Sequence, residues 1–193
     1  MSAEAIRIVV EPVSVLPEID SIPISFLVES VLDLRGGSPN RLGELRSRPV
    51  STPYVKDYDK DAGPPSSWST RFDVSRWGVV SAWVESRRVG SVVIAWDTPE
   101  ADMLEGRQDL GVLWDLRVLP EFRRQGIGAS MFCEAERWVA TRSGKILKVE
   151  TQDVNVGACR FYKQMGCHLE AIVPGAYPEL PDETQLLWYK RWT

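Results

Sequence analysis

Residues 111–141 constrain the fold more than any other part of the chain. An apolar run over 111–118 is typical of a buried strand, and Pro120 ends it. After the turn, apolar residues recur at three- and four-residue spacing, which predicts an amphipathic helix over 126–141. A strand that leads directly into such a helix indicates helices packed on a sheet.

The other apolar runs continue this alternation of strands and helices. We expect strands at residues 6–10, 79–84, 89–96, 146–150, 167–173 and 185–192. Helical spacing predicts helices over 14–34 and 155–165, whereas the Pro-, Ser-, Asp- and Gly-rich stretch 38–76 predicts an irregular surface segment. This order predicts an α/β (α+β) fold, in which one domain over 1–193 has a mixed central sheet with helices on both faces.

Composition excludes several classes of protein. The 193 residues are 44% hydrophobic and 26% charged, as in ordinary globular domains. A net charge of −4 argues against nucleic-acid or membrane partners, and the chain lacks the run of about 18 apolar residues that a spanning helix needs. One histidine, His168, and three cysteines without CxxC spacing argue against a metal site. These cysteines, with no leader pattern at the start, predict a cytoplasmic protein.

The charge is distributed unevenly along the chain. Residues 52–115 carry 11 acidic and 7 basic side chains, whereas residues 116–163 carry 5 acidic and 9 basic ones. Adjacent acidic and basic stretches suit separate pockets for a cation and a polyanion, although ordinary surface variation is an alternative.

The turn before the predicted helix 126–141 has the features of an anion site. Gly126 and Gly128 permit a tight turn and leave N–H groups accessible, and Arg123 and Arg124 add positive charge. The glycines match neither the GxxxxGK[ST] loop nor the complete GxGxxG fingerprint of nucleotide-binding proteins. On the glycines alone, a plain strand-to-helix turn is an equal alternative.

Two motifs together resemble the GCN5-related N-acetyltransferase (GNAT) family. Residues 123–128 (RRQGIG) match its R-x-x-G-x-G pyrophosphate loop, and residues 155–166 match its N-x-x-A-x-x-F-Y-x-x-x-G pattern. Three other segments are similar to the streptothricin acetyltransferases of that family, namely 48–58, 150–152 and 183–189. The resemblance implies a GNAT fold with an acetyl-CoA-binding core at about residues 111–166.

The resemblance also implies which residues bind acetyl-CoA, the expected cosubstrate. The backbone of Leu116 and Val118 is expected to pair with the pantetheine arm like an added strand. The pyrophosphate is expected to lie on the loop formed by Arg123, Arg124, Gln125, Gly126, Ile127, Gly128 and Ala129. Asn155 and Tyr162 are expected near the thiol end, two helical turns apart on one face.

Acetyl transfer to an amine calls for a general acid and a general base. Tyr162 is the predicted acid, because a phenol is protonated at neutral pH; core packing is its alternative role. Asp115 is the predicted base, or else a carboxylate that binds the cationic amine, and Glu150 is the reserve candidate. The acidic, aromatic segment with Tyr54 and Tyr58 suits a cationic substrate, although a solvated loop is an alternative. The predicted substrate contacts are therefore Tyr54, Tyr58, Asp115 and Glu150.

We therefore predict an acetyl-CoA-dependent N-acetyltransferase that acts on a primary amine of a small cationic molecule, with a streptothricin-type antibiotic as one candidate. The alternatives are an acetyltransferase for protein N-termini or lysines, and a non-catalytic acyl-CoA-binding module. A homodimer is implied by the resemblance only.

Overall fold

The structure is a computed structural model that describes residues 5–34 and 45–192, and its chain forms two compact units. The first unit consists of Met1–Ser25 and Asp57–Leu147, and the second of Phe26–Lys56 and Lys148–Thr193. Two compact units are compatible with one domain or with two. The single domain over 1–193 therefore stays a prediction.

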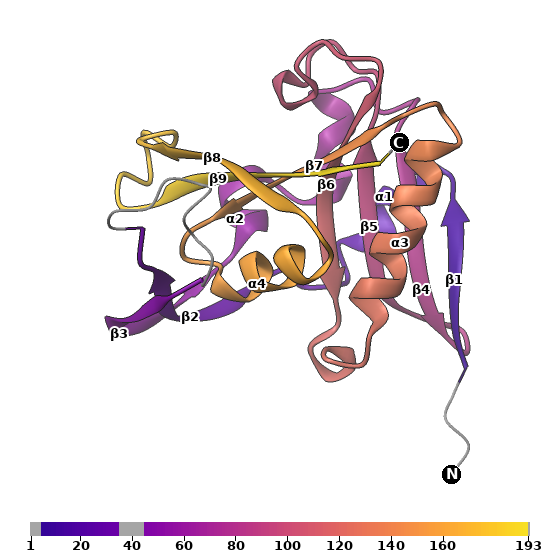
Figure 1. Ribbon diagram of the computed structural model, residues 1–193. Coiled ribbons are helices and arrows are strands. Elements are labelled where there is room, and N and C mark those ends of the chain that lie inside the picture. The colour runs from indigo at the N-terminus through magenta and orange to yellow at the C-terminus, as the bar shows by residue number, and fades with distance from the viewer. Residues whose placement is uncertain (1–4, 35–44, 193) are drawn as a thin grey trace. The chain divides into compact units, whose positions relative to one another are not determined.

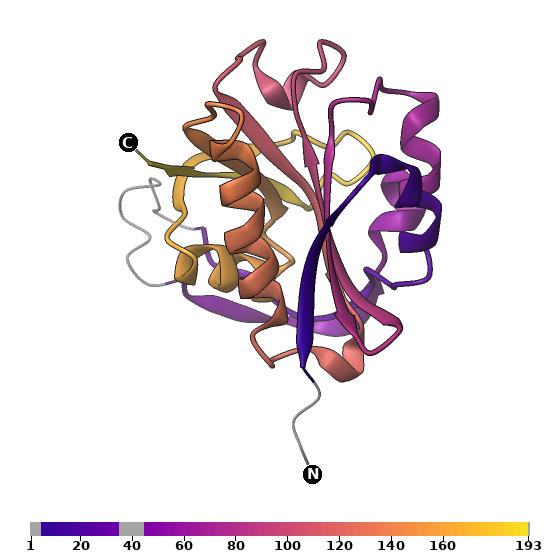
Figure 2. The same cartoon turned by 90° about the vertical axis from the view of Figure 1, so that its right-hand side faces the viewer.

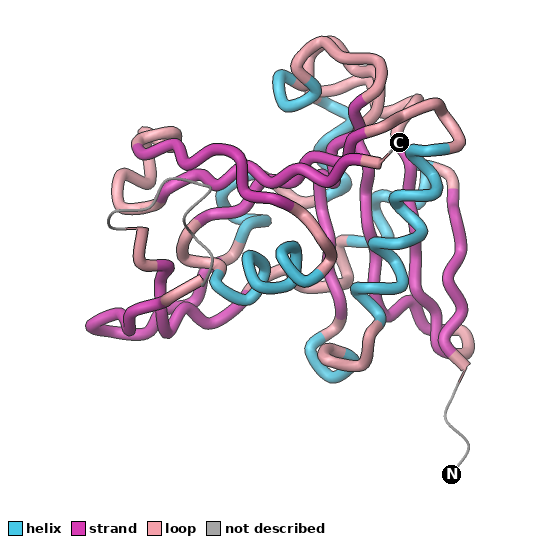
Figure 3. The backbone as a smooth tube through the Cα atoms, viewed as in Figure 1, coloured by secondary structure: helices cyan, strands magenta, loops and turns pink. Residues whose placement is uncertain are grey.

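The first unit is built on an antiparallel sheet. Its strands, in the order β1-β4-β5-β6, are β1 (Ile6–Glu11), β4 (Gly78–Val84), β5 (Arg87–Ala95) and β6 (Leu110–Val118) (Figure 1; Figure 3). Nearly every residue of β4 and β5 is buried, which agrees with their continuous apolar runs.

Helices cover both faces of this sheet, as Figure 2 shows. On one face lies α3 (Ile127–Ala140), which approaches closely because Gly78 and Gly111 have no side chains. A Cβ atom at these two positions would collide with Trp138 and Val139 of α3. The other face carries η1 (Val13–Val15), α1 (Leu16–Ile19), α2 (Tyr58–Ala62) and the 3-10 helix η3 (Pro65–Thr70). Two further 3-10 helices are η4 (Asp102–Leu104) and η5 (Pro120–Phe122).

The second unit contains a two-stranded ribbon and three strands of a sheet, the first of which begins two residues before Lys148. The antiparallel ribbon consists of β2 (Phe26–Leu32) and β3 (Ser47–Lys56). The three strands, in the order β7-β9-β8, are β7 (Ile146–Gln152), β9 (Thr184–Arg191) and β8 (His168–Pro174), and α4 (Val156–Gln164) follows β7. Val28 and Val31 of β2 pack against Val154, so the ribbon and the β7–α4 connection share an apolar core.

The helix predicted over 14–34 is wrong in its second half. There the chain forms strand β2 instead. Val28, Val31 and Leu32 of this strand are buried, whereas Leu27 is 55% exposed, and an irregularity between Val28 and Ser30 interrupts the strict alternation of a strand. The predicted helix counted Leu27 among the residues that face the core, and its exposure contradicts this. Pro23 also disfavours helical conformation at the residue before it.

The stretch 38–76 is more regular than predicted. Residues 38–44 lie outside the described part of the chain, and the rest contains β3, α2 and η3. The prolines at 49 and 53 argue against a strand, because proline cannot donate a ladder hydrogen bond. They are tolerated in β3 because a two-stranded ribbon consists of edge strands.

The other predicted elements agree with the structure to within two residues at each end. They include the β4–β5 hairpin, β6, α3 and everything after residue 146. These strands and helices follow one another in the predicted order, so the predicted α/β class is confirmed.

Candidate active site

The loop before α3 has the backbone geometry of an anion site. Gly126 caps the helix with a φ of 82°, and Arg124 also has a positive φ, of 64°. A Cβ atom at Gly126 would meet no atom within 4 Å, so the space in front of this residue is open. The first turn of a helix leaves N–H groups without intrahelical acceptors, here those of Ile127, Gly128 and Ala129. These donors and the open space fit a phosphate group.

Two side chains of the loop stabilise its shape. Arg123 donates from Nε to the carbonyl of Val118 at 2.9 Å, and Gln125 donates from Nε2 to the carbonyl of Glu121 at 3.1 Å. The side chain of Arg124 is exposed, as are those of Arg123 and Gln125. Arg123 and Gln125 therefore brace the turn, and Arg124 is the cation of this loop that is placed to meet an anion.

Leu116 and Val118 direct their backbone polar groups away from β5. The N–H of Leu119 donates to the carbonyl of Val89, at the end of the β5–β6 ladder. The direction of hydrogen bonding alternates along an antiparallel strand. The backbone N–H and C=O groups of Leu116 and Val118 therefore point toward the edge of β6 that faces away from β5. An extended ligand arm can form hydrogen bonds with groups that point this way.

A β-bulge in β6 decides where Asp115 lies. The β5–β6 register shifts at Trp114, which is an extra residue in β6. Gly111 faces α3, and strict alternation from it would place Asp115 on the same face. The extra residue reverses the alternation, so Asp115 and Arg117 lie on the face that carries α2.

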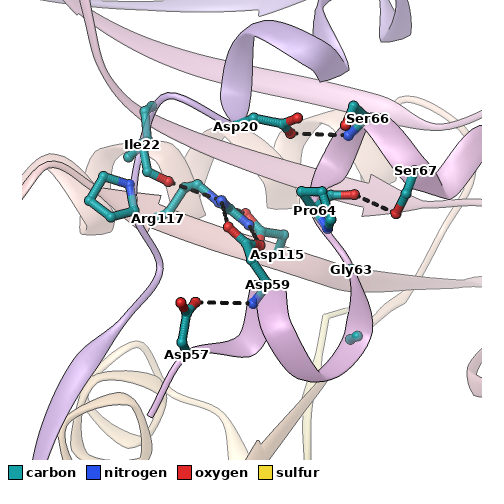
Figure 4. A network of polar contacts seen from close by, with 12 residues as sticks. Asp20, Ile22, Asp57, Asp59, Gly63, Pro64, Ser66, Ser67, Asp115 and Arg117 are labelled. Carbon is teal, nitrogen blue, oxygen red and sulfur yellow. Dashed lines mark hydrogen bonds and ion pairs between the residues drawn. The ribbon is translucent and has the colours of Figure 1, made fainter. Parts of the chain in front are cut away.

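Asp115 and Arg117 form a buried ion pair on that face (Figure 4). Arg117 donates from Nε and Nη2 to the two oxygens of Asp115, at 2.8 and 2.7 Å. Its Nη1 and Nη2 also donate to the two oxygens of Asp59, both at 3.1 Å, and Nη1 donates to the carbonyl of Ile22 at 2.9 Å. All five N–H groups of the guanidinium therefore have an acceptor.

The environment of this pair affects both pKa values. Burial raises the pKa of Asp115 above its ordinary value, although the hydrogen bonds and charge of Arg117 oppose this. Burial by itself lowers the pKa of Arg117, but Asp115 and Asp59 outweigh it, so the pKa is raised. Arg117 therefore stays cationic and engages both oxygens of Asp115.

Glu150 on β7 has neutral partners instead. The hydroxyl of Tyr177 donates to Oε1 of Glu150 at 2.6 Å, and Gln185 donates from Nε2 to Oε2 at 2.7 Å. Gln152 in turn donates from Nε2 to the hydroxyl oxygen of Tyr177 at 3.1 Å. These donors orient the half-buried carboxylate without cancelling its charge.

Asn155 and Tyr162 belong to α4. Asn155 is the N-cap of the helix, and its Oδ1 accepts from the N–H of Ala158 at 3.0 Å. Tyr162 is buried, and its ring packs edge-on against Phe161 at a centroid distance of 5.2 Å. Both residues thus have a structural role within or next to α4.

The two tyrosines predicted to contact substrate lie in different units. Tyr54 is on β3, where burial raises its pKa and the charge of Glu183 adds to this effect. Tyr58 is the first residue of α2. Trp68 of the same sequence segment is 4% exposed and packs near Trp77, so it belongs to the core. The predicted acidic, aromatic loop is therefore not one continuous surface segment.

Within residues 5–34 and 45–192, no group of three His, Cys, Asp or Glu side chains could hold a metal ion. In the same part of the chain, no helix is long and apolar enough to cross a membrane.

Comparison with known families decides the assignment. The model of the acetyltransferase (GNAT) family matches residues 44–167, more than half of the chain. This chain belongs to the GNAT family. The resemblance inferred from the two motifs is therefore confirmed, and the protein is an acetyltransferase.

Two curated relatives of this GNAT protein are streptothricin acetyltransferases. That of Escherichia coli is 28% identical over 169 residues, which cover 85% of this chain and 84% of the relative. Streptothricin acetyltransferase A of Bacillus subtilis (strain 168) is 30% identical over 77 residues, which cover 39% of this chain and 44% of the relative.

Solved structures confirm the GNAT fold. A Bacillus anthracis str. Ames protein assigned as a streptothricin acetyltransferase, in complex with acetyl coenzyme A, has a TM-score of 0.76 at 21% identity and covers 97% of this chain and 100% of its own. Nourseothricin acetyltransferase has a TM-score of 0.72 at 21% identity, with coverage of 97% and 98%.

Sequence reasoning missed two residues of this GNAT protein that shape the candidate site. Arg117 follows Asp115 by two positions on one strand, a spacing that places both on one face and could have indicated the pair. Tyr177 is 27 residues from Glu150, and no local pattern points to their contact.

Proposed function

We propose that this GNAT enzyme transfers an acetyl group from acetyl-CoA directly to a primary amine of a small cationic molecule. A streptothricin-type antibiotic is the first acceptor to test, because the Escherichia coli relative that aligns with 85% of the chain is a streptothricin acetyltransferase. A homodimer stays a proposal that a measurement of mass in solution can test.

The backbone geometry of the loop before α3 supports one part of the proposed acetyl-CoA contacts. Its backbone N–H groups and Arg124 would hold the pyrophosphate, while Arg123 and Gln125 keep the loop in shape. The backbone of Leu116 and Val118 would hold the pantetheine arm, and Asn155 would contact the thiol end. The acetyl-CoA supplies an activated thioester, and the protein supplies its orientation and the proton transfers.

The observation that carries the proposal is the environment of Glu150. A cationic amine must lose a proton before it can attack the thioester, and the base needs a carboxylate whose charge is not already neutralised. Glu150 has neutral donors, whereas Asp115 has Arg117 on both oxygens. We therefore assign the base role to Glu150 in preference to Asp115, which keeps a supporting role.

Tyr162 completes the reaction as the general acid. As the amine nitrogen bonds to the acetyl carbon, the carbon–sulfur bond breaks, and the phenol of Tyr162 protonates the departing thiolate. The proton removed from the ammonium goes to Glu150, so the products are the acetylated amine and free CoA thiol.

A thiol-release assay with acetyl-CoA and a panel of acceptors tests the proposal. The panel contains streptothricin, simple polyamines, lysine-containing peptides and a peptide with a free N-terminus. Turnover confined to small amines supports the proposal. Turnover of peptides alone would establish the protein-acetylating alternative, and tight acetyl-CoA binding with no turnover would establish a binding module.

A further inference from the structure

Helix α2 is attached to the first unit by charge and not by an apolar face. It has five residues and none of them is buried, whereas the neighbouring η3 buries Pro65 and Trp68. A helix this short is not stable alone. Its backbone is capped by Asp57, whose Oδ1 accepts from the N–H of Asp59 at 3.3 Å. The position of α2 therefore depends on polar contacts.

The contact that joins α2 to β6 is the ion pair between Asp59 and Arg117, while the end of α2 is also held by Arg71, whose Nη2 donates to the carbonyl of Ala62 at 2.7 Å. The ion pair consists of two parallel hydrogen bonds, and this bidentate geometry sets orientation as well as distance (Figure 4). Arg117 is in turn held on its other side by Asp115 and by the carbonyl of Ile22. A further attachment follows in η3, where Asp20 accepts from the N–H of Ser66 at 3.1 Å.

The charges of this arrangement leave a negative edge at α2. Two carboxylates share one guanidinium, so the three side chains carry a net charge of −1. The side chain of Arg117 is 1% exposed, whereas that of Asp59 is 25% exposed. Asp59 is therefore the carboxylate of this group that an approaching cation can reach, next to Tyr58 at the start of the helix.

We propose that Arg117 is a positioning residue for the acceptor amine. Together with Asp115 it holds Asp59, and thereby α2, in the orientation in which Tyr58 and the exposed edge of Asp59 bind a cationic group of the acceptor. This inference rests on the proposed function, and it explains why a carboxylate and an arginine are buried together beneath an exposed helix.

We call the ion pair between Asp59 and Arg117 the latch. The variant that tests it must not leave Asp115 or Arg117 buried without a partner of opposite charge. Arg117→Met would leave Asp115 buried without a cation, and such a variant can fail to fold. Asp59→Ala leaves Arg117 paired with Asp115 and hydrogen-bonded to the carbonyl of Ile22, so no buried charge loses its partner. Asp57→Asn is the matched control, because it removes one charge from the same segment but keeps a capping oxygen and the latch.

Hydrogen exchange of residues 57–63 provides the first measurement, without any ligand. We expect exchange about 10-fold faster or more in Asp59→Ala, and unchanged in Asp57→Asn, because loss of the latch opens α2 locally. If these amides exchange at the wild-type rate in Asp59→Ala, the ion pair between Asp59 and Arg117 does not hold α2 in place.

Steady-state kinetics provide the second measurement. In Asp59→Ala we expect the acceptor KM to rise about 10-fold, with the acetyl-CoA KM nearly unchanged. An acceptor KM equal to that of the wild type would overturn the positioning role, even if the variant were less stable. A wild-type enzyme inert toward every small amine would instead overturn the proposed function, and the exchange measurement would still decide whether the latch holds α2.

Discussion

Asp115 on β6 and Glu150 on β7 are both strand carboxylates, and both were candidates for the general base. Asp115 is buried, and a buried arginine occupies both of its oxygens. Glu150 is half-buried, and its oxygens accept from a phenol and an amide. The two residues thus differ less in the number of hydrogen bonds than in the charge of the donors.

This difference separates a structural carboxylate from a reactive one. A cationic donor offsets the negative charge of a carboxylate and occupies its oxygens, whereas neutral donors fix its orientation and leave its charge in place. The same charge is available to bind an ammonium group before it is deprotonated. The following variants test this comparison.

Glu150→Gln should have the largest effect. Glutamine keeps the size of the side chain but cannot take a proton, so kcat/KM should fall about 10²- to 10⁴-fold. The thiol-release assay measures this, and the melting temperature checks that the variant is folded. Turnover close to that of the wild type would remove Glu150 from the base role.

Tyr162→Phe should follow, because it removes the acid and keeps the ring that packs against Phe161. We expect kcat to fall about 10²-fold while the KM for acetyl-CoA changes little, since the hydroxyl acts in the transition state. If kcat is maintained, the buried tyrosine is a packing residue only.

Asp115→Asn should mainly affect stability. Asparagine loses the charge-assisted hydrogen bonds to Arg117, which keeps Asp59 as its charged partner, so we expect the free energy of unfolding to fall by about 2 kcal/mol, measured by urea denaturation. The loss in kcat per folded molecule should be much smaller than for Glu150→Gln. A large loss of kcat with unchanged stability would reverse the comparison and make Asp115 the base.

Asp153→Asn should have the smallest effect on stability. It extends the comparison to a third carboxylate, which has a neutral donor as Glu150 does. Asp153 is buried and accepts from the N–H of Thr184 at 2.9 Å, and burial raises its pKa. Between the unfolded-state pKa and the native pKa, the native protein keeps a proton on Asp153 that the unfolded chain has lost. The contribution of Asp153 to the free energy of unfolding is therefore largest below the unfolded-state pKa and is lost as pH rises through the native pKa.

The measurement for Asp153 is the free energy of unfolding of both proteins as a function of pH. The wild type should lose stability relative to Asp153→Asn as pH increases from about the unfolded value of an aspartate, near 3.9. A difference between the two proteins that does not change with pH would contradict the prediction.

Much of the fold could be predicted because its signals are local. The apolar runs of β4, β5 and β6 and the amphipathic spacing of α3 lie within single elements, and they were correct to within two residues. The prediction failed at β2 because Leu27 is apolar but exposed, and at β3 because its prolines argue against a strand. In both cases the environment of an exposed ribbon decided the outcome.

The sequence by itself determined the family, because the motifs at 123–128 and 155–166 are contiguous and their glycines and asparagine serve backbone geometry close by. The tertiary structure decided which carboxylate is neutralised. A bulge at Trp114 turns Asp115 and Arg117 toward Asp59, 58 residues from Arg117, and the β8–β9 region brings Tyr177 and Gln185 to Glu150. Contacts between residues so far apart in the sequence depend on how the elements pack, and a local sequence pattern cannot predict them.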